Sequence, residues 1–277
     1  MSSPERLCEG RVALITGASR GIGAAIAERL ASEGAAVALA ARSLDTAPKD
    51  LPGTLREQVA TIEARGGRAL AVQSDAALGA DRERMVSACE KELGPIDILV
   101  NNAAAGPYRP ALEFTDHDFS KTLELNVNAT LHLSQLVLPG MCERGSGWIV
   151  NISSATVKHP EGPPYIAWEK LGGHHLYGAS KAMLDRLTTG FAAEFCEKGI
   201  AINTLAPVAA VITPGVESKG IAQFIEDSMI EPVEAMAEAA LLLSSCDPAR
   251  LTGRVTYSGD LLEEFGREIR ALDGSPR

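Results

Sequence analysis

Apolar and polar positions alternate along the chain with two different periods. Short uninterrupted apolar runs are typical of strands that are buried on both faces, whereas apolar residues at every third or fourth position are typical of helices. Residues 12–15 form a run of the first kind, and Ile22, Ile26 and Leu30 then recur at helical spacing. The chain therefore begins with a strand, a turn and a helix.

The same alternation continues almost to the end of the chain. Thr54 and Glu57 match a capping box, which predicts the start of a helix at residue 55, and the glycine pair 66–67 predicts its end. Strands this short and this apolar belong in a parallel sheet that helices cover on both faces, so we expect a doubly wound, Rossmann-like α/β fold. The predicted strands are 12–15, 37–41, 69–73, 96–100, 148–152, 200–205 and 255–258, and the predicted helices are 22–34, 55–65, 81–93, 115–142, 177–197 and 233–244.

The length of the chain fits one large core. Its 277 residues are many for a single domain and few for two, and no linker, repeat or low-complexity tract divides them. We therefore expect one domain over residues 1–277. Residues 273–277 carry no periodic pattern, and we expect them to fray.

Charge and composition narrow the class of ligand. Apolar residues make up 45% and charged residues 22% of the chain, as in an ordinary globular protein. The 26 basic and 36 acidic residues give a net charge of −10, which argues against a nucleic acid or an anionic membrane as partner. Small molecules are the expected ligands.

The five cysteines are far apart and form no C-x-x-C pair, so neither a disulfide framework nor a zinc site is predicted. The first ten residues lack the apolar core of a secretory signal, and no apolar run approaches membrane-spanning length. These features predict a cytoplasmic protein without a metal site.

Three glycines stand between the first predicted strand and its helix. Gly17, Gly21 and Gly23 follow the pattern G-x-x-x-G-x-G. At this point of a doubly wound fold the backbone approaches a pyrophosphate, and the helix N-terminus stabilises its negative charge. A glycine triplet is often only a tight turn, but its place between a strand and an amphipathic helix favours nucleotide binding.

Tyr177 and Lys181 lie four residues apart in a predicted helix, which places a phenol and an ammonium on one face. A phenol titrates at about pH 10 and exchanges protons poorly at neutral pH unless a nearby cation favours its anion. Such pairs also occur as solvated surface neighbours. The pair therefore indicates a functional site only if other motifs in the chain support it.

Several motifs occur together in a fixed order. Residues 16–23 read TGASRGIG and residues 101–104 read NNAA, and Asn126, Ser154 and the Tyr177/Lys181 pair follow. In this order the motifs resemble the short-chain dehydrogenase/reductase family, and the resemblance extends from about residue 11 to residue 257. Residues 52–55 and 62–67 are similar to a subgroup that includes hydroxysteroid dehydrogenase-like proteins, which would imply bulky lipophilic substrates.

The resemblance implies a proton-transfer centre. Tyr177 would pass a proton to or from the reacting oxygen, and Ser154 would hydrogen-bond the same oxygen. Lys181 would hold the ribose hydroxyls of the cofactor and, together with the positive charge of the oxidised nicotinamide, lower the pKa of the phenol. Asn126 would order a water molecule on a relay to Lys181.

Other candidates for these roles are weaker. Tyr165 also follows the serines, but the residue four positions later is Glu169, whose charge would raise the pKa of a phenol. Ser153 precedes Ser154, and because side chains alternate along a strand only one of the two can readily face the cofactor. His174 and His175 do not predict a metal site, because no pattern of acidic residues or cysteines accompanies them. We expect them to lie in a loop.

The resemblance also implies a nicotinamide cofactor. The second predicted strand ends in Ala41-Arg42, where an acidic residue would bind the ribose of NAD and an arginine would accommodate the 2′-phosphate of NADP. Arg20 adds a second possible cation, so NADP(H) is expected in preference to NAD, although both arginines could instead be solvated surface residues. The implied cofactor-binding residues are Gly17, Ser19, Arg20, Gly21, Ile22, Gly23, Arg42, Asp75, Asn102, Ala103, Tyr177, Lys181 and Pro207.

The sequence departs from the family pattern at three places, one of which is Gly259-Asp260 in place of the usual closing glycine pair. Residues 155–176 form a longer connection than the family usually has, and their composition predicts a loop, in which Tyr165 and Trp168 either face the substrate or pin the loop to the protein. Val208 replaces the glycine that usually follows Pro207, which puts the local backbone shape in doubt. Residues 211–231 are the expected substrate lid.

The sequence thus predicts an NADP(H)-dependent oxidoreductase that acts on a carbonyl or a secondary alcohol. A catalytically silent NADP-binding or scaffold protein of the same fold is the alternative, since fold alone does not establish activity. The resemblance implies a homotetramer or a homodimer.

Overall fold

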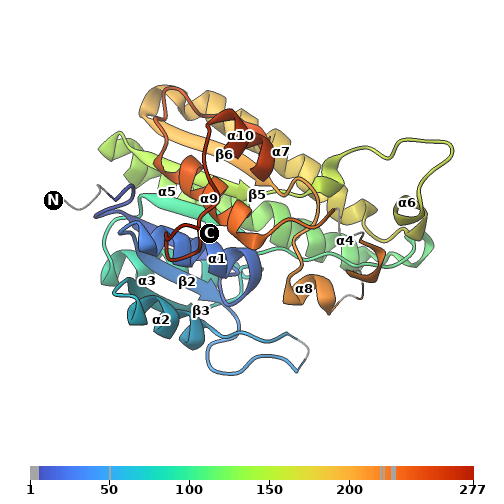
Figure 1. The fold of residues 1–277 in the computed structure, drawn as a ribbon, viewed down its shortest axis with the longest axis horizontal. Coiled ribbons are helices and arrows are strands. Elements are labelled where there is room, and N and C mark those ends of the chain that lie inside the picture. The colour runs from blue at the N-terminus through green and yellow to red at the C-terminus, as the bar shows by residue number, and fades with distance from the viewer. Residues whose placement is uncertain (1–5, 50, 219, 221, 226–228) are drawn as a thin grey trace.

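The computed structural model describes residues 6–49, 51–218, 220, 222–225 and 229–277. Within them, seven parallel strands form one sheet in the order β3-β2-β1-β4-β5-β6-β7 (Figure 1). The order reverses between β1 and β4, which confirms the doubly wound fold. The strands are β1 (Val12–Thr16), β2 (Ala36–Ala41), β3 (Arg68–Gln73), β4 (Ile98–Asn101), β5 (Gly147–Ile152), β6 (Ile200–Ala206) and β7 (Val255–Tyr257).

Helices connect the strands and cover both faces of the sheet (Figure 1). The α-helices are α1 (Gly21–Ser32), α2 (Leu55–Ala64), α3 (Gly79–Glu92), α4 (Asp116–Leu123), α5 (Ala129–Arg144), α6 (Ala167–Leu171), α7 (His175–Phe195), α8 (Pro214–Glu217), α9 (Val233–Ser245) and α10 (Ser258–Glu264). Short 3₁₀ turns lie at η1 (Ala111–Glu113), η3 (Ala155–Val157), η4 (Cys196–Lys198) and η5 (Ala222–Phe224), and η2 (Glu124–Asn128) is a π-helical turn. The predicted capping box opens α2, where Thr54 accepts a hydrogen bond from the Glu57 backbone.

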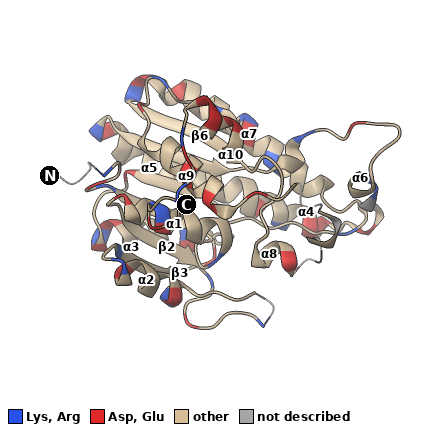
Figure 2. Cartoon of the chain, viewed as in Figure 1, with Lys and Arg blue, Asp and Glu red and all other residues tan. Residues whose placement is uncertain are grey.

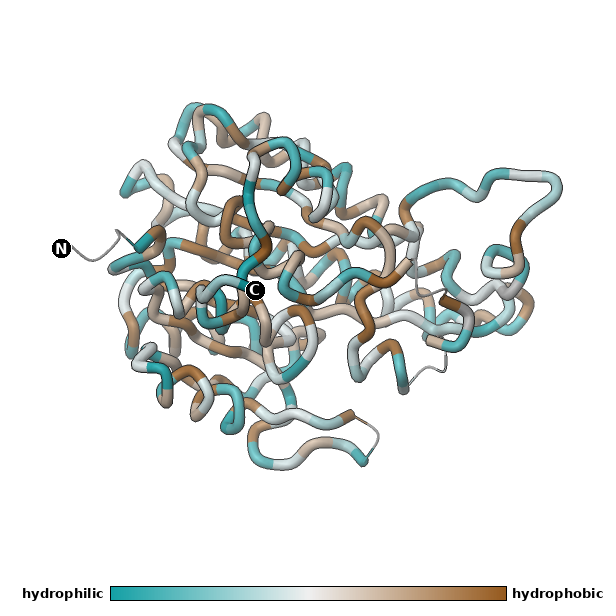
Figure 3. The backbone as a smooth tube through the Cα atoms, in the orientation of Figure 1, coloured by the Kyte–Doolittle hydropathy of each residue, from teal (hydrophilic) through white to brown (hydrophobic). Residues whose placement is uncertain are grey.

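Side chains of the central strands enter two separate cores, as the two-residue period of a strand requires. Ala13 and Ile15 of β1 pack with residues of α1 and α9 on one face. Val12 and Leu14 pack with residues of α3 and α5 on the other. Hydrophobic colour recurs along the strands, and hydrophilic colour dominates the loop that projects after β5 (Figure 3).

Charged residues lie mainly on the outer helices and connecting loops, with both signs interspersed (Figure 2). Among the described residues, no helix combines the length and the apolar character needed to cross a membrane. The same residues contain no cluster of three or more histidine, cysteine or acidic side chains arranged to hold a metal ion.

The predicted helix 115–142 consists of three consecutive pieces, α4, η2 and α5. A π-helical turn adds a residue to the turn and interrupts the regular hydrogen-bond ladder, and such turns are frequent at functional sites. Asn126 lies inside this turn and is buried. The hydrophobic period predicted the helix but not this local widening.

Three local predictions were wrong. The stretch 155–176 is not a loop throughout, because it contains η3 and α6. The predicted last strand ends one residue early, since Ser258 begins α10, a helix that the pattern did not predict. His174 and His175 are not loop residues either, because they form the N-cap and the first residue of α7.

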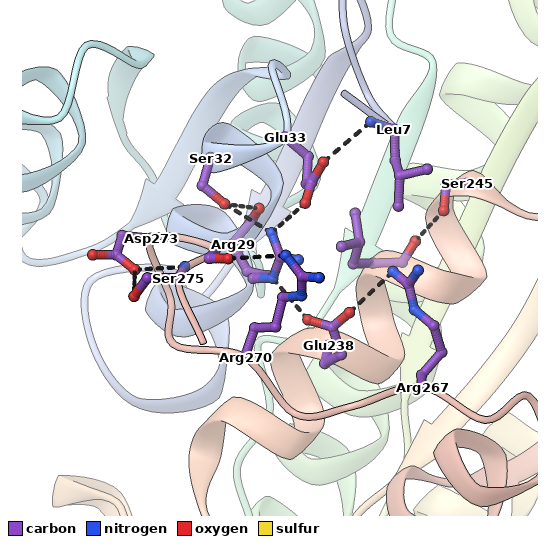
Figure 4. A network of polar contacts seen from close by, with 12 residues as sticks. Leu7, Arg29, Ser32, Glu33, Glu238, Ser245, Arg267, Arg270, Asp273 and Ser275 are labelled. Carbon is purple, nitrogen blue, oxygen red and sulfur yellow. Dashed lines mark hydrogen bonds and ion pairs between the residues drawn. The ribbon is translucent and has the colours of Figure 1, made fainter. Parts of the chain in front are cut away.

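The end of the chain is not frayed as predicted. Arg270 pairs with Pro276 in an isolated β-bridge, and this segment lies against a buried ionic network (Figure 4). Glu238 of α9 accepts from Arg29 of α1 at 2.8 Å and contacts Arg267 at 3.0 Å. Because Arg29 and Glu238 are each only 1% exposed, the network ties the C-terminal segment to the two helices that cover one face of the sheet.

Candidate active site

The turn between β1 and α1 has a shape that only glycine permits. Gly17 and Gly21 have φ values of +68° and +59°, in the left-handed region. A Cβ atom on Gly17 would lie 2.8 Å from the Asn102 side-chain nitrogen, and one on Gly23 would lie 2.6 Å from the Gly17 carbonyl oxygen. The three glycines thus let the backbone fold tightly at the N-terminus of α1, which is the arrangement a pyrophosphate requires.

Asn102 braces this turn from the end of β4. Its side-chain nitrogen donates to the carbonyl oxygens of Thr16 at 2.9 Å and Gly17 at 3.2 Å. The Thr16 hydroxyl oxygen accepts from the backbone N–H groups of Asn102 and Ala103, both at 3.0 Å. The adjacent ends of β1 and β4 are therefore locked together at the point where the strand order reverses.

A cavity of about 560 Å³ opens along these strand ends. It runs from Arg20 and Arg42 at one end, past the glycine turn, to Tyr108 and Tyr177 at the other. Of the predicted cofactor residues, those that line it are Gly17, Ser19, Arg20, Gly21, Ile22, Arg42, Asp75, Asn102, Ala103 and Tyr177. Gly23, Lys181 and Pro207 are not among the lining residues: Gly23 is the third residue of α1, Lys181 is buried on α7, and Pro207 follows the end of β6.

Two guanidinium groups lie near each other at the first end of the cavity. Arg42 and burial both lower the pKa of Arg20, burial more strongly. Arg20 is held by the 43–53 segment, since it donates to the carbonyl oxygens of Pro52 at 2.9 Å and Gly53 at 2.7 Å and to the Ser43 hydroxyl at 3.1 Å. Two cations that line the same part of the cavity favour the binding of an anion there.

Asp75 lines the same part of the cavity from the segment after β3. One of its carboxylate oxygens accepts from the Ala77 backbone N–H at 3.0 Å, and its own N–H donates to Asp81 at 2.7 Å. Asp75 thus shapes a turn at the cavity wall as well as facing the cavity.

Tyr177, Ser154 and Lys181 meet at the other end. Ser154 follows β5, and its hydroxyl hydrogen-bonds the Tyr177 phenol, which lowers the pKa of the phenol. Lys181 is one turn beyond Tyr177 on α7, with its Nζ 5.7 Å from the centre of the Tyr177 ring. The Nζ donates to the Ile152 carbonyl oxygen at 2.6 Å. The helix spacing and the end of β5 together bring the three groups to one point.

Burial shifts the pKa values of both Tyr177 and Lys181. It raises the pKa of Tyr177 above its ordinary value, and Tyr108 adds to the increase. Burial also lowers the pKa of Lys181 to about 8, while Asp185 opposes that change. Because the protein's own groups keep the phenol protonated, the expected decrease in the pKa of Tyr177 would need the additional positive charge of an oxidised cofactor.

Asn126 connects the π-helical turn to the active-site elements. Its amide nitrogen donates to the Ala105 carbonyl oxygen and to the Ser180 hydroxyl, both at 2.9 Å, and its amide oxygen accepts from the Ala105 N–H at 2.9 Å. Ser180 in turn donates to the Tyr177 carbonyl oxygen at 2.7 Å. Asn126 therefore fixes the loop after β4 against α7, next to both members of the Tyr177/Lys181 pair.

Tyr108 was not predicted from the sequence. It lines the cavity, its ring centre lies 6.0 Å from that of Tyr177, and burial raises the pKa of its phenol to about 12. Gly106 permits this approach, because a Cβ atom there would lie 2.9 Å from the Tyr177 Cβ. The glycine among small residues after the fourth strand was the available signal.

The two predicted loop aromatics do not line the cavity. Trp168 stacks on His174 with ring centres 4.8 Å apart, and His174 is within 3.1 Å of the Glu169 carboxylate. Tyr165 is exposed. The structure therefore places Trp168 as a contact between the loop and the start of α7.

The segment after β6 contributes several lining residues, namely Thr213, Gly215, Val216 and Ser218. Among the described residues, every positive φ belongs to a glycine, so Val208 adopts an ordinary backbone conformation. The Val208 N–H hydrogen-bonds Glu231, at the far end of the predicted lid. Residues 219, 221 and 226–228 of that lid lie outside the described part of the chain.

Comparisons with known proteins agree with this geometry. The chain matches the family model "short chain dehydrogenase" over residues 11–220. It is 34% identical over 257 residues to hydroxysteroid dehydrogenase-like protein 2 of Danio rerio, covering 93% of this chain but only 59% of that protein. It is 33% identical over 265 residues to 7alpha-hydroxysteroid dehydrogenase of Escherichia coli strain K12, covering 93% and 96% of the two chains.

A solved structure supports the same relationship. The structure of a 7 alpha-hydroxysteroid dehydrogenase complexed with NADH and 7-oxo glycochenodeoxycholic acid has a TM-score of 0.78 at 27% identity, and the match covers 100% of this chain and 99% of that one. The family match, the reversed strand order and the glycine turn lead to one conclusion. The chain belongs to the short-chain dehydrogenase family of oxidoreductases, with hydroxysteroid dehydrogenase-like proteins among its relatives.

Proposed function

We propose that this chain is an NADP(H)-dependent oxidoreductase that interconverts a carbonyl group and a secondary alcohol, with Tyr177 as its general acid and base. The observation that carries the proposal is one cavity with the Tyr177 phenol at one end and the Arg20/Arg42 pair at the other. The glycine turn lies between them. A dinucleotide has the same order of parts, namely a reactive ring, a pyrophosphate and an adenosine ribose.

The residues present fit such a cofactor. A Cβ atom on Gly17 or Gly23 would collide with Asn102, and one on Gly23 would also collide with the Gly17 carbonyl oxygen, so the turn packs against the end of β4 with no room for a side chain. The first N–H groups of α1 would bind the pyrophosphate, and Tyr177, with Lys181 beside it, would face the reactive ring. When bound, the nicotinamide would supply or accept the hydride.

The protein's own groups manage the proton. Tyr177 is protonated at neutral pH because burial raises the pKa of its phenol. It can therefore donate a proton to a carbonyl oxygen during reduction, and Ser154 can hydrogen-bond that oxygen at the same time. Lys181 offsets the negative charge that remains on the Tyr177 oxygen, and Asn126 keeps α7 aligned with the loop that carries Tyr108.

The preference for NADP(H) rests on the end of β2. That strand ends at Ala41, which has no carboxylate to repel a phosphate, and Arg42 follows it. Asp45, the next acidic residue, forms an ion pair with Arg56. The electrostatic effect of Arg42 on Arg20 indicates two adjacent cations, which a 2′-phosphate would neutralise.

We further propose a bulky lipophilic substrate, by analogy with the hydroxysteroid dehydrogenase relatives, and a homotetramer or homodimer in the cytoplasm. All five cysteines are free, as a reducing compartment would allow. Light scattering on the purified protein would test the assembly.

The experiment that tests the function is a substrate panel. NADPH and NADH oxidation would be followed with aromatic, aliphatic and steroid ketones, and NADP⁺ and NAD⁺ reduction with the matching alcohols. We expect turnover of at least one ketone with a higher kcat/KM for NADPH. Tight NADPH binding without turnover of any substrate would instead identify a catalytically silent protein.

A further inference from the structure

A buried carboxyl group lies one helical turn beyond the catalytic lysine. Tyr177, Lys181 and Asp185 occupy positions i, i+4 and i+8 of α7, so their side chains lie on the same face of the helix. Lys181 is 1% exposed and Asp185 is 9% exposed. An acidic side chain this well buried needs a partner, because the loss of hydration otherwise disfavours its charge.

On the side that faces the sheet, Asp185 is surrounded by hydroxyl groups. The hydroxyl groups of Ser153, just after β5, and Thr204, on β6, are close enough to lower the pKa of the Asp185 carboxyl, although burial outweighs them and raises it overall. Neither hydroxyl oxygen, nor Asp185 Oδ1, has a hydrogen-bond partner of standard geometry within the described chain. Lys181 lies one turn earlier on the same face of α7. Its Nζ donates to the Ile152 carbonyl oxygen, and no ion pair joins it to Asp185 among the described residues, so the two buried charges interact electrostatically across one helical turn.

The two adjacent serines after β5 contact different side chains of α7. Ser154 hydrogen-bonds Tyr177, whereas Ser153 faces Asp185. The end of β5 therefore contacts α7 at two points, namely the phenol of Tyr177 and the carboxyl of Asp185 two turns further along the helix. Asp185 is thus part of the same contact between β5 and α7 that positions the proton-transfer pair.

We propose that Asp185 is a positioning residue for the Tyr177/Lys181 pair, whose carboxylate keeps Lys181 in its ammonium form. The inference rests on the proposed function, because it concerns the lysine of that same site. Lys181 needs such a partner, since burial by itself favours the neutral amine. Without the carboxylate, the charge that supports Tyr177 would be lost at a lower pH.

Three tyrosines and one lysine are also near this pair among the described residues. Tyr177 and Tyr108 lie on the cavity side, and Tyr257 of β7 lies close enough to Asp185 for the carboxylate to raise the pKa of its phenol. The Lys158 ammonium is 4.4 Å from the Tyr257 ring centre. Because burial raises the pKa of Tyr177 and lowers that of Lys181 to about 8, Lys181 is the group of the pair that titrates first on the alkaline side.

The test is to titrate Lys181 directly. Lysine labelled with ¹³C at Cε would be followed by NMR from pH 6 to 11, with the Lys181 resonance assigned by its absence in Lys181→Met. Asp185→Asn should lower the midpoint of Lys181 by about one pH unit, a tenfold change in the ratio of ammonium to amine, whereas Asp185→Glu should restore most of the shift. Asp185→Ser provides a second variant without the carboxylate, in case the amide is not tolerated.

Activity gives the independent readout. The alkaline limb of kcat/KM for NADPH-dependent ketone reduction should move to lower pH by the same amount in Asp185→Asn. Glu194→Gln removes one negative charge from the exposed surface of the same helix and should change neither the NMR midpoint nor the limb. An unchanged Lys181 midpoint in a folded variant without the carboxylate would overturn the inference.

The NMR titration separates this inference from the proposed function. A shifted midpoint in a protein that turns over no substrate would support the coupling of Asp185 to Lys181 and reject only the enzymatic role. An unshifted midpoint in an active enzyme would reject only the role of Asp185.

Discussion

The two ends of the cavity differ in how strongly local structure determines them. At the glycine turn, backbone geometry leaves no choice of residue, since Gly17 has a positive φ and a Cβ atom on Gly23 would collide with the turn itself. Beyond Tyr177, the long 155–176 connection projects from the body and carries the short helix α6 (Figure 1). Steric contacts within the glycine turn therefore determine the shape of the proposed nucleotide end of the cavity. The shape of the proposed substrate end, near Tyr177, depends on how long segments fold.

This difference explains why the chemistry of the site can be inferred in more detail than its substrate. The loop aromatics are fixed by contacts of their own, as in the stacking of Trp168 on His174. Tyr108 lines the cavity next to Tyr177, whereas Thr213, after β6, lies beside Gly21 of the glycine turn. The variants below probe one end or the other.

Gly23→Ala should have the largest effect at the nucleotide end. The new Cβ atom would lie 2.5 Å from Asn102 Nδ2 and 2.6 Å from the Gly17 carbonyl oxygen, so the turn must open. We expect the Kd for NADPH, measured by protein fluorescence, to rise by about 100-fold, equivalent to a displacement cost of about 3 kcal/mol.

Gly190→Ala is the matched control. It lies inside α7, where a Cβ atom would meet only the end of the Arg186 side chain, and alanine favours the helix. Equal NADPH binding by Gly23→Ala and Gly190→Ala would show that the turn is not the pyrophosphate site.

Arg42→Ala should have the next largest effect and should be selective. The loss of one charged contact to a 2′-phosphate at a partly exposed site should lower kcat/KM for NADPH by about tenfold, with kcat/KM for NADH nearly unchanged. Arg250→Ala, at an exposed position, removes the same charge as a control. An equal decrease with both cofactors would argue that Arg42 acts on the fold and not on the phosphate.

Trp168→Ala should have the smallest effect, at the substrate end. It removes a stacked ring pair worth about 0.5–1.5 kcal/mol, so the loop should become more susceptible to limited proteolysis while the Kd for NADPH stays constant. Substrate KM should change only a few-fold. Tyr165→Ala, at an exposed position, should leave the proteolysis rate nearly unchanged.

The opposite result for Trp168→Ala would change the conclusion about the substrate end of the cavity. A tenfold or larger increase in the KM for the ketone, with no change in proteolysis, would show that Trp168 contacts the substrate and that the loop moves to bring it there.

The sequence predicted the parts of the site that depend on local rules. The glycine turn follows from steric requirements at three neighbouring positions, and the Tyr177/Lys181 pair follows from helix geometry. A parallel sheet with helices on both faces also followed from the apolar runs. The roles assigned to these residues remain predictions until the variants are measured.

The contacts that the sequence did not reveal join distant segments. Tyr108 meets Tyr177 only because the loop after β4 folds back onto α7, and Asp185 meets Ser153 and Thr204 only once β5 and β6 are paired beneath the helix. The ionic network of Arg29, Glu238 and Arg267 joins three segments and orders the C-terminal residues that were expected to fray. Periodicity carries no information about such pairs, because each residue alone looks like an ordinary polar position.

The central claim is that Tyr177 is the proton donor at the end of a preformed cofactor cavity. The most direct measurement compares wild type and Tyr177→Phe for NADPH-dependent reduction of the best ketone, together with the Kd for NADPH. We predict a decrease in kcat of about 10³-fold with a change in Kd of less than about threefold, because the ring is retained and only the hydroxyl is lost. A Tyr177→Phe enzyme that keeps wild-type kcat would contradict the account.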